Sequence, residues 1–233
     1  MLAARAAHRH HARMPVHADP VSLPSLATDE VHVWQWTWTR DLGDLPPRRW
    51  LAAYAGVPAR ELTVLRGVHG KPYLVTPHDD IAFSWSHSGD RALLAVARGV
   101  GQLGVDIERS RPRPRLLELA RRFYAAEEAA ALEALPESGR LAAFLALWTA
   151  KEAVLKAHGG GLSYGLHRAR FALADPVRAV AFDGEIAPAS DWQLHDLKQG
   201  EGWHASVAWR GEPREVRLFE AQPVFTSPPE PFA

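Results

Sequence analysis

The sequence predicts an α+β protein built from two halves of similar size, and three observations support this. Short stretches that alternate apolar and polar residues, as strands do, occur in both halves of the chain. A helix-rich region lies between them and stops at three consecutive glycines, 159–161. The chain has 233 residues, 47% of them hydrophobic, which is enough for one large domain or two small ones. Two α+β halves with antiparallel strands are the simplest architecture.

The first half is predicted to begin in ordered structure near Val31 and to contain one helix. That helix, at 45–56, opens with prolines and closes on glycine, as short helices do. Alternation and flanking turn residues place the strands of this half at 32–38, 73–75, 81–85 and 92–97.

The second half is predicted to start with a strand at 102–108. Three helices follow, at 115–123, 126–135 and 139–158. The remaining strands are expected at 168–174, 178–182, 191–196, 203–209 and 214–220.

These elements set the expected domain boundaries. The N-terminal half spans 30–103 and the C-terminal half spans 104–223, followed by a loose proline-rich tail at 224–233. Residues 1–28 contain no acidic residue before Asp19 and no apolar stretch long enough for a signal peptide or membrane span. We expect a disordered extension there, or translation that begins at Met14; a transit peptide is the less favoured alternative.

The composition excludes several classes of function. Lys+Arg and Asp+Glu both total 27, so no overall charge attracts the protein to nucleic acid or to a membrane. The chain has no cysteine, which excludes disulfides, thiolate catalysis and zinc–thiolate sites. The lack of cysteine fits a reducing cytoplasm.

Two short motifs carry the chemistry. In Gly104–Glu108, apolar and acidic residues alternate, so that Asp106 and Glu108 project from one face of a strand. In the helical stretch Trp148–Lys156, Glu152 and Lys156 stand four residues apart on one face. Three carboxylates and one ammonium suit a hard divalent cation that holds a phosphate-bearing substrate.

These motifs occur together with three others in a characteristic order, and the chain resembles the 4′-phosphopantetheinyl transferase superfamily, especially its monomeric surfactin-synthetase-activating type. The resemblance runs from about residue 31 to residue 173. The motifs that carry it are Gly70-Lys-Pro72, Phe83-Ser-Trp-Ser-His-Ser-Gly89, Gly104-Val-Asp-Ile-Glu108, Arg122-Phe-Tyr-Ala-Ala-Glu-Glu128 and Trp148-Thr-Ala-Lys-Glu-Ala-Val-Leu-Lys156.

The resemblance implies a pseudo-dimer of two similar α/β halves with the active site between them. It also implies transfer of the 4′-phosphopantetheine group of coenzyme A to a serine of an apo acyl or peptidyl carrier protein, which gives holo carrier and 3′,5′-ADP. The expected cofactor is Mg²⁺, with Mn²⁺ as a substitute. We therefore expect a cytoplasmic monomer that has no nucleic-acid or membrane partner.

The same resemblance assigns roles to the central residues. Asp106, Glu108 and Glu152 would hold Mg²⁺, which keeps waters and phosphate oxygens as its other ligands. Lys156 would contact the pyrophosphate and the leaving group. Either Glu152 or a metal-bound hydroxide would accept the proton of the carrier serine. Glu152 and Lys156 are thus the expected catalytic residues.

Further residues are expected to bind coenzyme A. Ser86 and His87 match the family residues that meet the nucleotide 3′-phosphate, and Lys71 would add positive charge there. Arg48 and Arg49 are candidates by position alone.

Two other acidic and basic residues lie within the motifs. Glu128 could be a further metal ligand or base. Lys151, turned about 100° from Glu152 around the helix, is expected to pair with a structural carboxylate. For the carrier protein, whose docking helix we expect to be acidic, the candidate basic patch consists of Arg113, Arg115, Arg121 and Arg122.

The first half departs from the family pattern. Members of this type carry a basic helical segment there, whereas Trp38 and Trp50 are here only a dozen residues apart. Two or three missing phosphate contacts, each worth about 1.5–3 kcal/mol, would weaken coenzyme A binding. One alternative is therefore a catalytically impaired relative that binds coenzyme A or carrier protein without transfer. A metal-dependent nuclease is a second alternative, disfavoured by the zero net charge.

Overall fold

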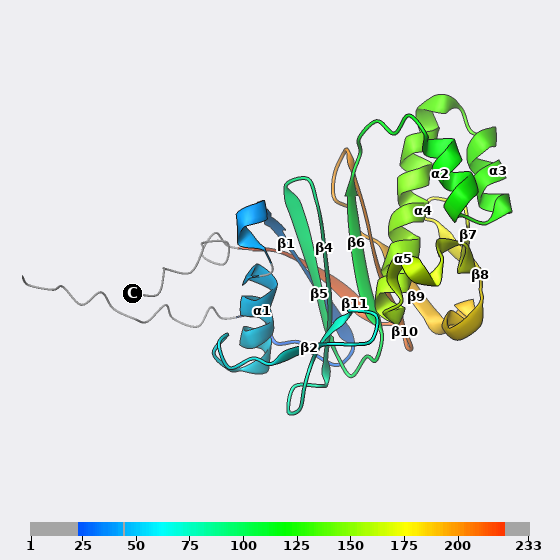
Figure 1. The fold of residues 1–233 in the computed structure, drawn as a ribbon. Coiled ribbons are helices and arrows are strands. Elements are labelled where there is room, and N and C mark those ends of the chain that lie inside the picture. The colour runs from blue at the N-terminus through cyan, green and yellow to red at the C-terminus, as the bar shows by residue number, and fades with distance from the viewer. Residues whose placement is uncertain (1–22, 44, 222–233) are drawn as a thin grey trace, which may run out of the picture.

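The computed structural model describes residues 23–43 and 45–221. Most of the predicted N-terminal extension (1–22) and the predicted tail (224–233) lie outside the described residues. Between these limits the protein is an α+β structure in four layers: a helix, a four-stranded sheet, a three-stranded sheet and a long helix (Figure 1). Within the described ranges, no helix has both the length and the apolar composition needed to cross a membrane.

The four-stranded sheet has the strand order β11-β1-β5-β4. One face of this sheet packs on helix α1 through Trp34, Trp36 and Trp50, all of which are buried. The bounds of its elements are β1 Glu30–Thr37, β4 Ile81–Ser88, β5 Arg91–Arg98, β11 Glu215–Glu220 and α1 Leu45–Ala55.

Strand β11 differs from the prediction. It was expected in the second half among antiparallel strands, but it pairs parallel with β1 in the sheet of the first half. The Phe219 ring stacks on Trp34 with 4.8 Å between the ring centroids. Alternation along a strand shows that the strand exists but says nothing about which neighbour it pairs with, so the sequence could not place β11.

The three-stranded sheet has the order β6-β10-β9 and is antiparallel throughout. Val105 and Ile107 pack toward Leu93 and Ala95 of the first sheet, and this contact forms the core between the two sheets. Helix α4 covers the opposite face (Figure 1). The bounds are β6 Leu103–Arg109, β9 Trp192–Asp196, β10 Trp203–Arg210 and α4 Glu137–His158.

The smaller elements surround these layers. Strand β2 and the one-turn helix α5 were not predicted, because they are too short for a periodic pattern. The remaining bounds are β2 Val64–Arg66, β3 Pro72–Leu74, α2 Leu116–Phe123, α3 Ala126–Ala134, α5 Gly161–Tyr164, β7 Ala169–Ala172 and β8 Arg178–Phe182, and the described residues also contain four short 3-10 turns.

Serine hydroxyls join the two sheets where their edge strands β4 and β6 meet. Ser84 Oγ accepts a hydrogen bond from the Val105 amide at 3.1 Å, and Ser88 Oγ accepts one from the Arg109 amide at 3.1 Å. Because these serines alternate along β4, they lie on one face of the strand and follow β6 along its length. Side-chain hydroxyls therefore satisfy amides of β6 that would otherwise lie unpaired at a sheet edge.

Gly104 allows helix α4 to lie directly against β6. A Cβ atom at this position would stand 1.9 Å from the Ala153 carbonyl oxygen and 2.5 Å from the Ala157 nitrogen. Both contacts are with backbone, which cannot rotate away as a side chain can. The glycine that opens the Gly-Val-Asp-Ile-Glu motif is thus required by close packing beside the acidic residues.

We predict that Gly104→Ala destabilises the fold by about 1–3 kcal/mol or more, because one methyl group would force α4 away from β6. Urea unfolding followed by circular dichroism measures the change. Gly101→Ala is the matched control, since nothing lies within 4 Å of a Cβ at that position. Equal stability of the two variants would contradict the proposed close contact.

Candidate active site

Three elements bring a compact group of polar side chains together at the edge where β4 meets β6. Asp106 Oδ1 accepts a hydrogen bond from Ser86 Oγ of β4 at 2.7 Å, and it also lies 2.7 Å from Lys156 Nζ of α4. The Lys156 ammonium in turn donates to Ser86 Oγ at 2.8 Å. The aspartate, serine and lysine therefore form a closed triangle that joins both sheets and the long helix.

Asp106 keeps one oxygen available. Its side chain is buried, and Oδ2 is buried without a hydrogen-bond partner among the described residues. An unpaired buried carboxylate oxygen is costly, because the desolvation of the charge is not compensated by a donor. This oxygen is therefore suited to accept a cation.

Glu152 lies on α4, close enough to Asp106 to be affected by its charge, and is 7% exposed. Burial, and secondly the charge of Asp106, raise the pKa of Glu152 to about 7, although Lys156 acts in the opposite direction. Its neighbours shift this pKa through charge rather than through hydrogen bonds. Glu152 is thus a carboxyl group that can take up or release a proton near neutral pH.

Glu108, two residues after Asp106 on β6, is the third carboxyl group of the site. Its Oε2 accepts hydrogen bonds from Ser88 Oγ at 3.1 Å and from an Arg113 Nη at 3.3 Å. Burial and the charge of Asp106 raise the pKa of Glu108 as well. The carboxyl groups therefore destabilise one another's charged forms, as carboxylates that share a site do.

The predicted metal ligands are close but do not form a coordination sphere. In the described part of the chain, no three Asp, Glu or His side chains are arranged closely enough to hold a metal ion. The Lys156 ammonium instead neutralises Asp106 directly. The unpaired Asp106 oxygen and the raised pKa values of Glu108 and Glu152 nevertheless fit a hard cation, which oxygen donors prefer.

Lys71 points to backbone atoms. Its Nζ donates to the Leu103 carbonyl at 3.0 Å and to the Ala157 carbonyl at 2.6 Å. Burial lowers the pKa of Lys71 to about 8. Lys71 also lines a cavity of about 230 Å³, to which Lys156, Trp85, Arg66 and His69 contribute. The sequence pointed to neither Arg66 nor His69, because they lie in the β2–β3 hairpin outside every motif.

His87 is exposed and stacks on an aromatic ring that the sequence did not single out. The His87 and Trp38 ring centroids are 3.7 Å apart, with an angle of 15° between the planes. Partial loss of solvent around the ring, followed by the charge of Lys156, lowers the pKa of His87. Trp38 thus fixes the orientation of the imidazole beside the site.

Arg48 contacts the loop that follows α1 rather than the carboxylate group. Its guanidinium donates to the Ala59 carbonyl at 2.9 Å and to the Leu62 carbonyl at 2.5 Å, and so it holds the loop that follows α1. Arg49 is half-buried on the same helix. The positions of Arg48 and Arg49 along the helix could not show whether their side chains contact a substrate or a loop.

Glu128 is also fully engaged, so it is not available as a metal ligand or base. It accepts hydrogen bonds from the Ala125 amide at 2.9 Å and the Phe171 amide at 2.8 Å, and it lies 2.7 Å from Lys151 Nζ. Both members of this ion pair are buried. The prediction that Lys151 pairs with a structural carboxylate is confirmed.

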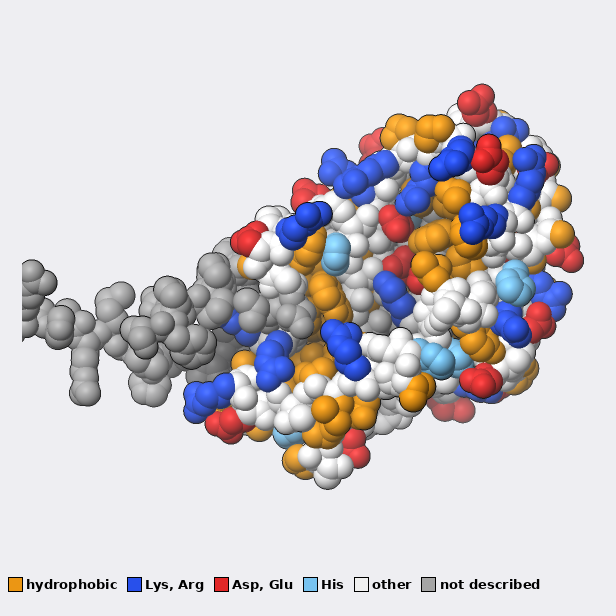
Figure 2. Space-filling model, viewed as in Figure 1, with side chains coloured by type: hydrophobic (Ala, Val, Ile, Leu, Met, Phe, Trp, Pro, Cys, Tyr) orange, Lys and Arg blue, Asp and Glu red, His pale blue; other side chains and the backbone are white. Residues whose placement is uncertain are grey.

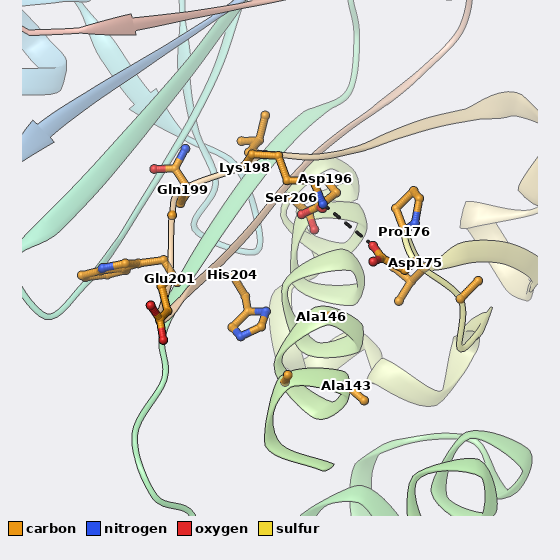
Figure 3. Close-up of a pocket in the computed structure, with 16 residues that line it drawn as sticks. Ala143, Ala146, Asp175, Pro176, Asp196, Lys198, Gln199, Glu201, His204 and Ser206 are labelled. Atoms are coloured by element: carbon orange, nitrogen blue, oxygen red, sulfur yellow. Dashed lines mark hydrogen bonds and ion pairs between the residues drawn. The ribbon is translucent and has the colours of Figure 1, made fainter. Parts of the chain in front are cut away.

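A second cavity, of about 540 Å³, lies between the beginning of α4 and the loops that follow β7 and β9 (Figure 3). Ala143 and Ala146 form part of its apolar wall. The Lys198 ammonium lies 3.8 Å from Asp175 across its opening. None of the predicted site residues lines this cavity, so it is separate from the carboxylate group.

Carboxylates and a lysine gathered at one strand edge can together hold a cation and a phosphorylated ligand. Comparison with known proteins agrees. Residues 102–208 match the 4′-phosphopantetheinyl transferase superfamily. The chain is 34% identical to the 4′-phosphopantetheinyl transferase HetI of Nostoc sp. over 163 residues, which is 69% of this chain and 66% of HetI. This chain belongs to the 4′-phosphopantetheinyl transferase superfamily.

Two further relatives match over shorter stretches. The transferase psf-1 of Bacillus pumilus is 34% identical over 125 residues, 54% of this chain and 52% of the relative. The transferase AcpT of Escherichia coli O157:H7 is 36% identical over 117 residues, 48% of this chain and 58% of the relative. The chain thus spans about half to two thirds of the length of these three curated relatives.

We predict that, without metal, Glu152 makes stability fall as pH rises from about 4.5 to 7. The folded-state pKa is raised to about 7 from 4.5, so the folded protein binds more protons than the unfolded chain in this window. The loss is about 3 kcal/mol at most and is complete above pH 7. Glu152→Gln should make this slope shallower in urea unfolding measured with EDTA, while Glu108, whose pKa is also raised, keeps its own contribution.

Glu137→Gln, which changes an exposed glutamate of the same helix, serves as the control and should follow the wild-type pH profile. If Glu152→Gln keeps the wild-type slope, the group that titrates in this window is not Glu152.

Proposed function

We propose that this protein transfers the 4′-phosphopantetheine group of coenzyme A to a serine of an apo acyl or peptidyl carrier protein, releasing 3′,5′-ADP. The observation that carries the proposal is the convergence of Asp106, Glu152 and Lys156 with Ser86 at the β4–β6 edge. Superfamily membership and the names of the relatives support it.

A pseudo-dimeric arrangement follows from the same proposal. The N-terminal half (30–103) supplies β4 with its serines, and the C-terminal half (104–223) supplies β6 and α4. The site then lies between the halves, and one chain is sufficient to form it. Figure 2 shows a hollow between the α1 side and the α4 side of the molecule in which acidic and basic side chains meet.

Mg²⁺ is the cation that the donor set suits, and Asp106, Glu108 and Glu152 would hold it. Mn²⁺ would accept the same oxygens. When bound, the ion supplies positive charge that neutralises pyrophosphate oxygens during the transfer. Glu152, whose pKa is about 7, must be deprotonated to act as a ligand, so we expect cation affinity to increase as pH rises through neutrality.

The side chains of the protein then have distinct tasks. The oxygen of the carrier serine bonds to the β-phosphorus of coenzyme A while the bond from that phosphorus to the bridging oxygen breaks. Lys156 stabilises negative charge on the pyrophosphate and on the departing 3′,5′-ADP. The Glu152 carboxylate accepts the serine proton.

The nucleotide of coenzyme A would lie in the 230 Å³ cavity beside Lys156. Trp85 provides an aromatic wall there, and Arg66 and His69 provide donors for phosphate groups. Ser86 and His87 remain the candidates for the 3′-phosphate, and Arg49 remains a candidate by position. The hairpin residues would thus replace part of the charge that the short first half lacks.

Intact-protein mass spectrometry tests the activity. Apo acyl and peptidyl carrier proteins are incubated with this protein, coenzyme A and Mg²⁺, and a gain in mass equal to phosphopantetheine is expected. Asp106→Ala and Glu152→Ala should each lower the rate by at least about a hundredfold, because each removes a carboxylate that would hold the cation. Glu137→Ala is the matched control and should retain the wild-type rate.

No mass gain on any carrier type, with folded protein that still binds coenzyme A in calorimetry, would contradict transfer. That result would favour the catalytically impaired relative.

For the carrier, we propose docking beside α2. Arg115 and Arg122 are exposed there, whereas Arg113 contacts Glu108 and Arg121 pairs with Glu133 at 2.6 Å. Figure 2 shows Lys and Arg side chains gathered with hydrophobic ones over the end of the molecule that carries α2 to α4. An acidic helix of the carrier would complement this surface.

Reversal of both exposed charges (Arg115→Glu with Arg122→Glu) should raise the KM for the carrier by about tenfold and leave the KM for coenzyme A unchanged. Steady-state transfer kinetics measure both values. Arg60→Glu with Arg178→Glu reverses two exposed arginines outside this surface and serves as the control. An unchanged KM for the carrier would exclude the α2 surface.

A further inference from the structure

Lys71 occupies an unusual position for a residue expected to bind phosphate. The tight hairpin turn before β3 fixes its backbone, since the Gly67 amide donates to the Lys71 carbonyl at 2.9 Å and the Gly70 amide donates to the Gly67 carbonyl at 2.8 Å. Its ammonium crosses from this hairpin to the second half of the chain, where it meets the carbonyls of Leu103 and Ala157.

These two carbonyls belong to the elements that carry the candidate catalytic residues. Ala157 lies in the last turn of α4, directly after Lys156, and Leu103 opens β6 three residues before Asp106. The last carbonyls of a helix have no partner within the helix and carry partial negative charge. The Lys71 ammonium satisfies one of them and joins it to the beginning of β6.

The residues around Lys71 indicate that its side chain has a structural role. Its side chain runs past Gly159, where a Cβ atom would stand 3.5 Å from Lys71 Cδ and 3.6 Å from Lys71 Cβ. Gly159 ends α4 with a φ of +97°, a conformation that favours glycine. Burial alone accounts for the lowered pKa of Lys71, and no carboxylate contributes to it.

We propose that Lys71 is a positioning residue, which fixes the last turn of α4 against β6 and thereby holds the Lys156 ammonium between Asp106 and Ser86. Its role is therefore to orient Lys156 rather than to contact the 3′-phosphate of coenzyme A. A compact ammonium with three donors on a long stem can reach carbonyls of two different elements. The kinetic consequences rest on the proposed function, whereas the structural ones do not.

The test compares Lys71→Met with Arg214→Met. The Arg214 guanidinium also donates to backbone carbonyls, those of Thr28, Arg98 and Gly99, none of which belongs to the candidate site. With coenzyme A, Lys71→Met should lower kcat at least tenfold with KM within twofold of wild type, and Arg214→Met should leave both unchanged. Calorimetry should give Kd values for coenzyme A and dephospho-coenzyme A that change by less than twofold.

A phosphate contact gives a different pattern. If Lys71→Met weakens binding of coenzyme A at least tenfold but leaves dephospho-coenzyme A unaffected, Lys71 touches the 3′-phosphate and the proposal is overturned. An unchanged kcat overturns it as well.

Amide hydrogen exchange tests the contact independently of transfer. Residues 153–160 should exchange at least tenfold faster in Lys71→Met than in the wild type or in Arg214→Met, and equal exchange would overturn the proposal. If the wild type modifies no carrier, the proposed function fails while exchange and binding still decide the role of Lys71. If Lys71→Met does not fold, Lys71→Gln, which retains one donor group, replaces it in all measurements.

Discussion

The contact of Asp106 with Lys156 and Ser86 is the interaction on which the rest of the site depends. It joins a strand of each sheet to the long helix through two distances of 2.7 Å. Because β4 and β6 are sheet edges bridged by serine hydroxyls, their relative position is set largely by side chains. The chemistry at this edge and the packing of the two halves are therefore determined by the same residues.

Two contacts fix the position of helix α4 and therefore the position of Lys156 relative to Asp106. On one side its backbone packs on Gly104, where even a methyl group would collide with the Ala153 carbonyl. On another side of the helix, the buried Lys151 pairs with Glu128, which also accepts hydrogen bonds from two backbone amides. Breaking such a buried pair on one side leaves an uncompensated charge, so the helix cannot easily rotate. Glu152 and Lys156 consequently keep their places relative to β6.

The sequence predicted most of this structure but not the partners of its polar groups. Helix ends and strand alternation identified nearly every long element, since these patterns reflect burial along the chain itself. They could not place β11 beside β1, because pairing depends on the whole sheet. Charged residues in the motifs were assigned by type and spacing. Arg48, Glu128 and Lys71 bind backbone groups, and Glu128 also pairs with Lys151. Spacing along the chain does not reveal that such groups compete with a ligand for these side chains.

The contacts that Lys71 and Lys156 make within the protein affect the charge balance of the site. The ammonium of Lys71 is occupied by carbonyls and that of Lys156 is shared with Asp106 and Ser86, while Glu108 and Glu152 have raised pKa values. Added negative charge from a pyrophosphate would raise those pKa values further unless a cation entered with it. Binding of a phosphorylated ligand and of a cation at this edge should therefore be mutually reinforcing, with each lowering the electrostatic cost of the other.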